Sequence, residues 1–157
     1  MPGKPFIKPK KVSEFQERVL EIRRVTRVVA GGKRFSFRAT VVLGDGKGRV
    51  GVGVAKGLDV AASVEKAKRA AQREMFMVPL KENRTIPHDV DAKYSAAKVR
   101  LKPARSGHGL IAGGSVRAVL ELAGVKDISA KILGRTTNKL TNALATMEAL
   151  KKLMTVK

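Results

Sequence analysis

The chain has 157 residues, of which 43% are hydrophobic, and its 33 basic and 13 acidic residues give a formal net charge of +20. The apolar content is enough to build a core and excludes a purely disordered basic tail. So large a positive surplus repels itself, which points to a partner that supplies negative charge, with nucleic acid the leading candidate. The absence of cysteine excludes disulfide and thiolate chemistry, and no apolar run approaches the roughly 20 residues of a membrane span.

The first 13 residues combine three prolines with four lysines. Proline prevents both helix and interior strand in such a segment. We predict that residues 1–13 form a flexible basic tail, which is either a solubilising segment or an arm that orders on RNA. Because the segment lacks the apolar middle of a secretory signal, we expect a cytoplasmic protein.

Residues 14–80 are predicted to form a small β-β-β-α domain that binds RNA. Its β-branched residues favour a strand from about Val19 onward, and the pair Gly31-Gly32 predicts a turn. In the next strand, apolar and polar residues alternate. The apolar face comprises Phe35, Phe37, Ala39, Val41 and Leu43, and the polar face comprises Arg34, Ser36, Arg38 and Thr40. We expect the apolar face to pack in a core and the polar face to meet water or phosphate.

A glycine-rich turn at 44–48 is predicted to lead into a third strand at 49–55, whose valines at 50, 52 and 54 share one face. The opposite face carries Gly51 and Gly53, which indicates that a packed helix or a ligand backbone comes close there. Asp59 is a favourable N-cap for a helix that we expect to run from Val60 to about Met77. We expect Phe35, Phe37 and the valines to fix the sheet on this helix.

Residues 81–157 are predicted to form a second domain with the order β-β-α-β-α. Strands are expected at 89–94, 97–101 and 127–133, and a helix at 115–123 that Gly124 would end. A last helix is expected to run from a cap at Thr137 or Asn138 to about Met154. The predicted fold class is therefore α+β, with two small domains.

The sequence gives little support for an enzyme active site or a metal site. The run Gly46–Gly51 matches a dinucleotide fingerprint, but a strand follows it where that fold requires a helix. His88 and His108 have neither cysteines nor paired carboxylates near them in sequence, and Ser106 lacks the surroundings of a catalytic nucleophile. We expect no cofactor, no metal ion and no catalytic activity.

Basic residues concentrate around the first two turns, and we predict that they contact phosphate rather than only solvent. They are Arg23, Arg24, Arg27, Lys33, Arg34, Arg38, Lys47, Arg49 and Lys56. A second glycine cluster comprises Gly107, Gly109, Gly113 and Gly114. It would form either a phosphate-binding nest at a helix N-terminus or a close contact with another protein backbone, and both interpretations stay open.

Two blocks of the chain resemble the family of bacterial small-subunit ribosomal protein five. They are Gly-Gly-Lys-Arg-Phe-Ser-Phe-Arg-Ala at 31–39 with Val-Val-Leu-Gly-Asp-Gly-Lys-Gly-Arg-Val-Gly-Val-Gly at 41–53, and Gly-His-Gly-Leu-Ile-Ala-Gly-Gly-Ser-Val-Arg-Ala-Val-Leu-Glu-Leu-Ala-Gly at 107–124. The resemblance covers roughly residues 15–150. It implies an N-terminal domain like a double-stranded-RNA-binding module and a C-terminal β/α domain with a left-handed crossover.

The resemblance also implies a function: a structural constituent of the small ribosomal subunit that binds its ribosomal RNA. It implies contacts with ribosomal proteins four and eight, near the path by which messenger RNA enters, and support of assembly and translational accuracy. The loop at 25–32 would contact RNA through Thr26, Arg27, Val28, Gly31 and Gly32. The glycine cluster and Arg117 would face protein four.

This sequence departs from the family pattern at two places. Ala30 stands where many members carry a base, which would remove one phosphate contact. Asn138-Lys139 replaces the usual Asn-Pro in a loop that is one residue longer, so the cap of the last helix is in question. Two other functions remain to be separated by experiment, namely a DNA-compacting protein and a nucleotide-dependent enzyme.

Overall fold

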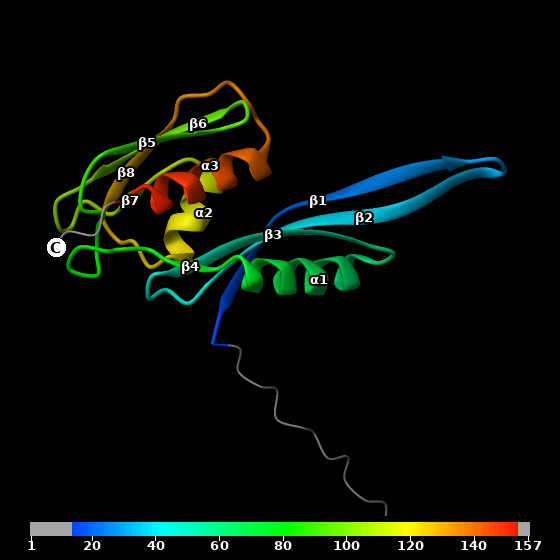
Figure 1. Cartoon of the computed structure of the whole chain (residues 1–157), viewed down its shortest axis with the longest axis horizontal. Helices are drawn as coiled ribbons and strands as arrows, with labels where there is room; N and C mark the ends of the chain where they lie inside the picture. The colour runs from blue at the N-terminus through cyan, green and yellow to red at the C-terminus, as the bar shows by residue number, and fades with distance from the viewer. Residues whose placement is uncertain (1–13, 154–157) are drawn as a thin grey trace, which may run out of the picture.

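The computed structural model describes residues 14–153, so the predicted tail at 1–13 lies outside the described residues. One sheet, in the order β1-β2-β3-β4, consists of β1 (Gln16–Val29), β2 (Gly32–Gly44), β3 (Arg49–Gly57) and β4 (Phe76–Met77). The other, in the order β5-β6-β8-β7, consists of β5 (Val90–Tyr94), β6 (Ala97–Pro103), β8 (Ile128–Ile132) and β7 (Leu110–Ile111). Three helices accompany them, which are α1 (Val60–Arg73), α2 (Gly114–Leu122) and α3 (Lys139–Lys151) (Figure 1). This content confirms the predicted α+β class.

The predicted helix end at Met77 is wrong. Helix α1 ends at Arg73, because Phe76 and Met77 pair with Val50 and Arg49 as strand β4. Both β4 and β7 have only two residues, which is too short for a period-2 pattern to be visible in the sequence. The predicted cap at Asp59 is present, since its carboxylate accepts a hydrogen bond from the Val60 N–H.

Helix α1 covers the glycine-bearing face of the first sheet. A Cβ added at Gly53 would lie 2.2 Å from the Ala67 carbonyl oxygen, and one at Gly51 would lie 2.3 Å from that of Ala71. The close approach predicted at these glycines is therefore that of a packed helix. Ala39 and Val41 of β2 share this face and pack on Ala67.

The opposite face of the same sheet is covered at one end by the second half of the chain. Val42, Val50 and Val52 belong to one core cluster with Val116 and Leu120 of α2. The prediction that the valines fix the sheet on its own helix is thus wrong for Val50 and Val52, and the predicted polar face of β2 does not extend as far as Thr40. Thr40 on that face is buried as well.

Backbone contacts join the two halves at the β2–β3 turn. The Gly46 N–H donates to the Leu122 carbonyl oxygen (3.0 Å) and the Gly48 N–H donates to that of Ala123 (2.9 Å). These bonds satisfy carbonyl groups that the C-terminal end of α2 leaves free. Gly124 follows with φ of +84°, as expected of a residue that ends a helix. The turn and the helix end therefore fix each other.

The second sheet has one parallel pair, β7 with β8, and the chain between them forms α2. Its inner face packs on α3, with Val99 and Leu101 in one core cluster with Met147 and Leu150. Of the two caps considered for α3, Asn138 is the one used, since its side-chain oxygen accepts from the Leu140 N–H at 3.1 Å. The helix ends at Lys151 rather than near Met154.

Candidate nucleic-acid interface

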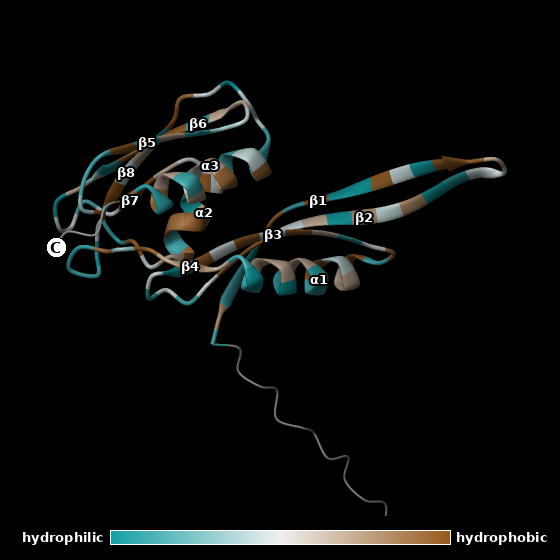
Figure 2. Ribbon diagram, in the orientation of Figure 1, coloured by the Kyte–Doolittle hydropathy of each residue, from teal (hydrophilic) through white to brown (hydrophobic). Residues whose placement is uncertain are grey.

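The outer part of the β1–β2 hairpin, residues 23–38, projects beyond the rest of the first sheet (Figure 1), and we call it the arm. Strand β3 pairs with β2 only as far as Phe37, so residues 32–36 pair with β1 alone. Figure 2 shows hydrophilic and hydrophobic residues alternating along both strands of the arm. Val28 near its tip is 76% exposed. The arm therefore presents two sides to its surroundings.

One side of the arm gathers arginines. In the strand register Arg23 lies opposite Arg38, and Arg27 lies opposite Arg34. Directly opposed residues of antiparallel strands place their side chains on the same face, and like charges there are destabilising. Lys56 extends the first pair across β3, as the partner of Arg38. An anion bound on this face would relieve the repulsion.

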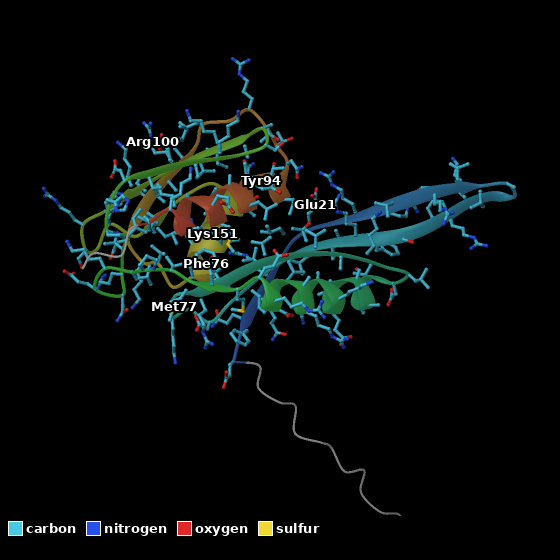
Figure 3. All side chains as sticks on the ribbon, in the orientation of Figure 1. Glu21, Phe76, Met77, Tyr94, Arg100 and Lys151 are labelled. Carbon is cyan, nitrogen blue, oxygen red and sulfur yellow. The ribbon has the colours of Figure 1, made fainter. Side chains whose placement is uncertain are left out.

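Only one carboxylate in the described part of the chain pairs with these arginines. Glu21, at the base of the arm (Figure 3), forms a 2.8 Å salt bridge with Arg23. The side chains of Arg27 and Arg34 have no such partner among residues 14–153. Of the two arginine pairs on this side of the arm, the outer pair, Arg27 and Arg34, is therefore the one without a carboxylate partner in the described chain.

The other side of the arm combines aromatic and basic groups. The Arg24 guanidinium lies 4.7 Å from the centre of the Phe35 ring, a cation–π contact. Phe35 is 48% exposed, so the prediction that it packs in the core is wrong. The arm extends past the end of α1 (Figure 1), so no element of the described structure covers the Phe35 side chain. Thr26 lies opposite Phe35, and Val28 lies opposite Lys33.

The tip of the arm has unoccupied space around its glycines. A Cβ added at Gly31 or Gly32 would meet no atom within 4 Å. Gly32 has φ of +143°, which favours glycine, whereas Gly31 has no such conformation. Within the described chain, neither sterics nor backbone conformation therefore requires glycine at position 31. A partner that approached the Gly31 backbone closely would require it.

Two predicted RNA-binding residues lie at the far end of the sheet from the arm. Lys47 lies in the β2–β3 turn and Arg49 is the first residue of β3, where the Asp45 carboxylate accepts a hydrogen bond from the Arg49 side chain at 2.7 Å. Asp45 also accepts hydrogen bonds from the Lys47 and Arg49 N–H groups. Burial raises the pKa of Asp45, but these bonds outweigh it and hold the pKa below its usual range. The structure therefore splits the predicted cations into two groups.

The second glycine cluster is organised by a residue that the sequence interpretation did not single out. The N–H groups of Gly107 and Gly109 both donate to Oδ1 of Asp127 at 3.0 Å. Oδ2 of Asp127 accepts from the Arg84 Nε at 2.9 Å. The hydrogen bond from Gly109, then that from Arg84, lowers the pKa of Asp127. Hence these two amides hold an internal carboxylate rather than standing open to a phosphate.

No sequence signal marked Asp127, because its partners lie at least 18 positions away and meet it only in the fold. The other two glycines of the cluster, Gly113 and Gly114, lie at the start of α2. Gly114 and Arg117 line a groove of about 560 Å³ between the two halves. The structure therefore separates the predicted protein-contact residues into a loop held by Asp127 and a groove at the α2 N-terminus.

Within the described residues, no cluster of histidine or acidic side chains could hold a metal ion. Helices long and apolar enough to cross a membrane are likewise missing from that part of the chain. The geometry is that of a basic α+β protein with a projecting cationic hairpin suited to a polyanion.

Comparison with known proteins identifies the family. Residues 15–79 match the family model of the N-terminal domain of ribosomal protein S5, and residues 92–157 match that of its C-terminal domain. The chain belongs to the ribosomal protein S5 family. This confirms the resemblance seen in the sequence, and it confirms the expectation of a structural, non-enzymatic ribosomal component.

Similar proteins carry the names small ribosomal subunit protein uS5 or uS5c. The small ribosomal subunit protein uS5 of Gloeobacter violaceus is 54% identical over 144 residues, covering 92% of this chain and 64% of the relative. The uS5 of Synechococcus elongatus is 51% identical over 145 residues, covering 92% and 80%. The uS5c of Rhodomonas salina is 52% identical over 145 residues, covering 92% and 86%. The chain thus spans about two thirds of the first relative and most of the other two.

Proposed function

We propose that the chain is a structural constituent of the small ribosomal subunit that binds small-subunit ribosomal RNA through the arm. The observation that carries this proposal is the pairing of Arg27 with Arg34 and of Arg23 with Arg38 across the exposed hairpin. Such pairs cost stability in the free protein and gain a counter-charge in a complex. Membership of a family of small-subunit ribosomal proteins supports the choice of RNA over DNA.

Binding would rest on phosphate contacts and on shape. Arginine presents a planar fork that can bind two phosphate oxygens at once, so opposed arginines suit the backbone of a folded RNA. The arm is a two-stranded ribbon with space around Gly31 at its tip, which allows a close approach of the RNA backbone there. We expect little reading of base edges, because structured RNA is recognised mainly by shape and backbone contacts.

A second surface would face ribosomal protein four. It comprises the loop that Asp127 holds, with Gly107 and Gly109, and the groove with Gly114 and Arg117, next to Gly113 at the N-cap of α2. Contacts with protein eight and a position near the messenger-RNA path follow from the resemblance, as does a role in assembly and accuracy. The protein would act in a cytoplasmic ribosome or, since relatives include the uS5c type, in an organellar one.

Replacement of both outer arginines by alanine, Arg27→Ala with Arg34→Ala, tests the proposal. We expect weaker binding to a transcript of small-subunit ribosomal RNA and a smaller dependence of affinity on salt. Two lost contacts reduce the log–log salt slope by about 1.4–1.8. The matched control removes two arginines from the exposed side of α1, with Arg69→Ala and Arg73→Ala, and circular dichroism checks folding of both variants.

The outcome that would refute the proposal is equal binding by the two double variants. Competition between the ribosomal RNA and duplex DNA separates a ribosomal role from general DNA compaction, because a DNA-compacting protein would be displaced equally by both. Addition of nucleotide serves as a further check, since a nucleotide-dependent enzyme would bind it saturably.

A further inference from the structure

The exposed face of the second sheet carries a group of lysines to which the sequence interpretation gave no role. Residues that alternate along β5, β6 and β8 point away from α3, since Ala92, Val99 and Leu101 occupy the inner face. On the outer face lie Lys93, Lys98, Arg100, Lys102 and Lys131, all exposed. Arg100 is labelled on this sheet in Figure 3.

The register again places like charges together. Lys93 lies directly opposite Lys98, and Arg100 lies opposite Lys131. Lys131 is also the diagonal neighbour of Lys98, because it lies opposite Arg100, two residues along β6 from Lys98. Such diagonal neighbours lie about 7–8 Å apart. Two adjacent cross-strand pairs of like charge on one flat face destabilise the free protein, as in the arm.

The acidic residues of this face neutralise only part of it. Asp91 binds Arg100 through two hydrogen bonds of 2.7 Å, so the guanidinium fork is already occupied. Asp89 lies 4.0 Å from Lys102. Among residues 14–153, no carboxylate lies within salt-bridge distance of Lys93, Lys98 or Lys131. Three lysine ammonium groups therefore remain without a salt bridge on the exposed face of the sheet.

We propose that the outer face of β5, β6 and β8 is a second RNA-binding surface, which contacts the sugar-phosphate backbone through Lys93, Lys98 and Lys131. This inference rests on the proposed function, because it takes ribosomal RNA as the partner. The surface is separate from the arm, since it lies on the other sheet. One protein would then hold two segments of RNA at once, through arginines on the arm and lysines on the second sheet.

The chemistry of the face favours an RNA backbone over an acidic protein. The lysine ammonium group acts as a point charge that tolerates a range of phosphate positions. Side chains two residues apart on one strand lie about 7 Å apart, so several of them can contact one RNA backbone. The outer face of these strands carries no aromatic residue on which a base could stack. Two exposed apolar side chains, Ile111 and Leu133, lie at opposite ends of β8, and two separated residues do not make the apolar centre that anchors a protein interface. We therefore expect binding that depends on salt and little on sequence.

The test compares three variants of the full chain in binding a transcript of full-length small-subunit ribosomal RNA over a range of salt concentrations. The face variant is Lys93→Gln with Lys98→Gln and Lys131→Gln. The charge-matched control is Lys66→Gln with Lys81→Gln and Lys126→Gln, which are exposed lysines elsewhere. The third is the arm variant, Arg27→Ala with Arg34→Ala. We expect the face variant to lose about 2–3 from the log–log salt slope relative to the control.

Acetylation of lysines in the complex, read by mass spectrometry, gives an independent measurement. We expect RNA to protect Lys93, Lys98 and Lys131 more than the three control lysines. Equal slopes and equal protection for face and control lysines would overturn this inference, and loss of binding by the arm variant in the same series would leave the proposed function standing. Protection by other small-subunit proteins but not by RNA would also overturn it, in favour of a protein partner. If wild-type protein binds no RNA, the proposed function fails first.

Discussion

Gly44→Ala is predicted to destabilise the whole protein by disturbing the contact between its two halves. A Cβ at this position would lie 2.2 Å from the Leu122 carbonyl oxygen, 2.7 Å from its carbonyl carbon and 2.9 Å from its Cβ. These atoms belong to the end of α2 or lie next to its backbone, so no flexible side chain can move aside. The helix end must shift by about 1 Å, since C···O contacts rarely fall much below 3.3 Å.

The magnitude follows from three contributions. Overpacking of a buried site costs about 1–3 kcal/mol. The shift also strains the bonds from Gly46 to Leu122 and from Gly48 to Ala123, each worth about 1 kcal/mol. Against these, replacement of glycine by alanine stabilises by about 0.4–1 kcal/mol through the unfolded chain. We therefore expect a net loss of about 1–4 kcal/mol, or roughly 2–16 °C in Tm for a chain of this size.

Thermal unfolding followed by two probes tests this prediction. Far-UV circular dichroism reports on all elements, and the fluorescence of Tyr94, the single tyrosine of a chain without tryptophan, reports on the second half. Because Gly44 lies in the first half and the core is shared, we expect both signals to shift together. The control is Gly31→Ala, where an added Cβ meets nothing within 4 Å. Equal Tm values for the two variants, or a shift in only one signal, would refute the reasoning.

Two further predictions concern the second half. Asn138→Ala should cost about 1 kcal/mol, or roughly 2–4 °C in Tm, by removing the cap of α3, whereas Thr137→Ala should not; equal effects in thermal unfolding would contradict the assigned cap. The lowered pKa of Asp127 means that its contribution to stability is full above the unfolded value of about 3.9 and is lost as pH falls through the lowered one. Urea unfolding across this range should therefore show a flatter pH dependence for Asp127→Asn than for wild type, and parallel curves would count against the assignment.

Much of the fold could be predicted from local sequence patterns. The alternation along β2 from Arg34 to Thr40, the cap at Asp59 and the turn glycines each depend on a few neighbouring residues, and local rules suffice for them. The helix end at Arg73 was not accessible, because residues 74–77 continue a helical pattern and only the pairing of Phe76 with Val50 draws them into the sheet. Asp127 escaped notice for the same reason, since its hydrogen-bond partners are distant in sequence.

The sequence by itself determined the fold class, the family, the positive charge and the residues that make the arm basic. Charge and periodicity are properties of single residues and short segments, so they can be counted without a structure. Only the tertiary structure decided that Arg27 faces Arg34, that Lys93 faces Lys98, and that Lys47 and Arg49 lie away from the arm. Strand register and sheet packing depend on contacts between distant segments, and those contacts decide which charges act together.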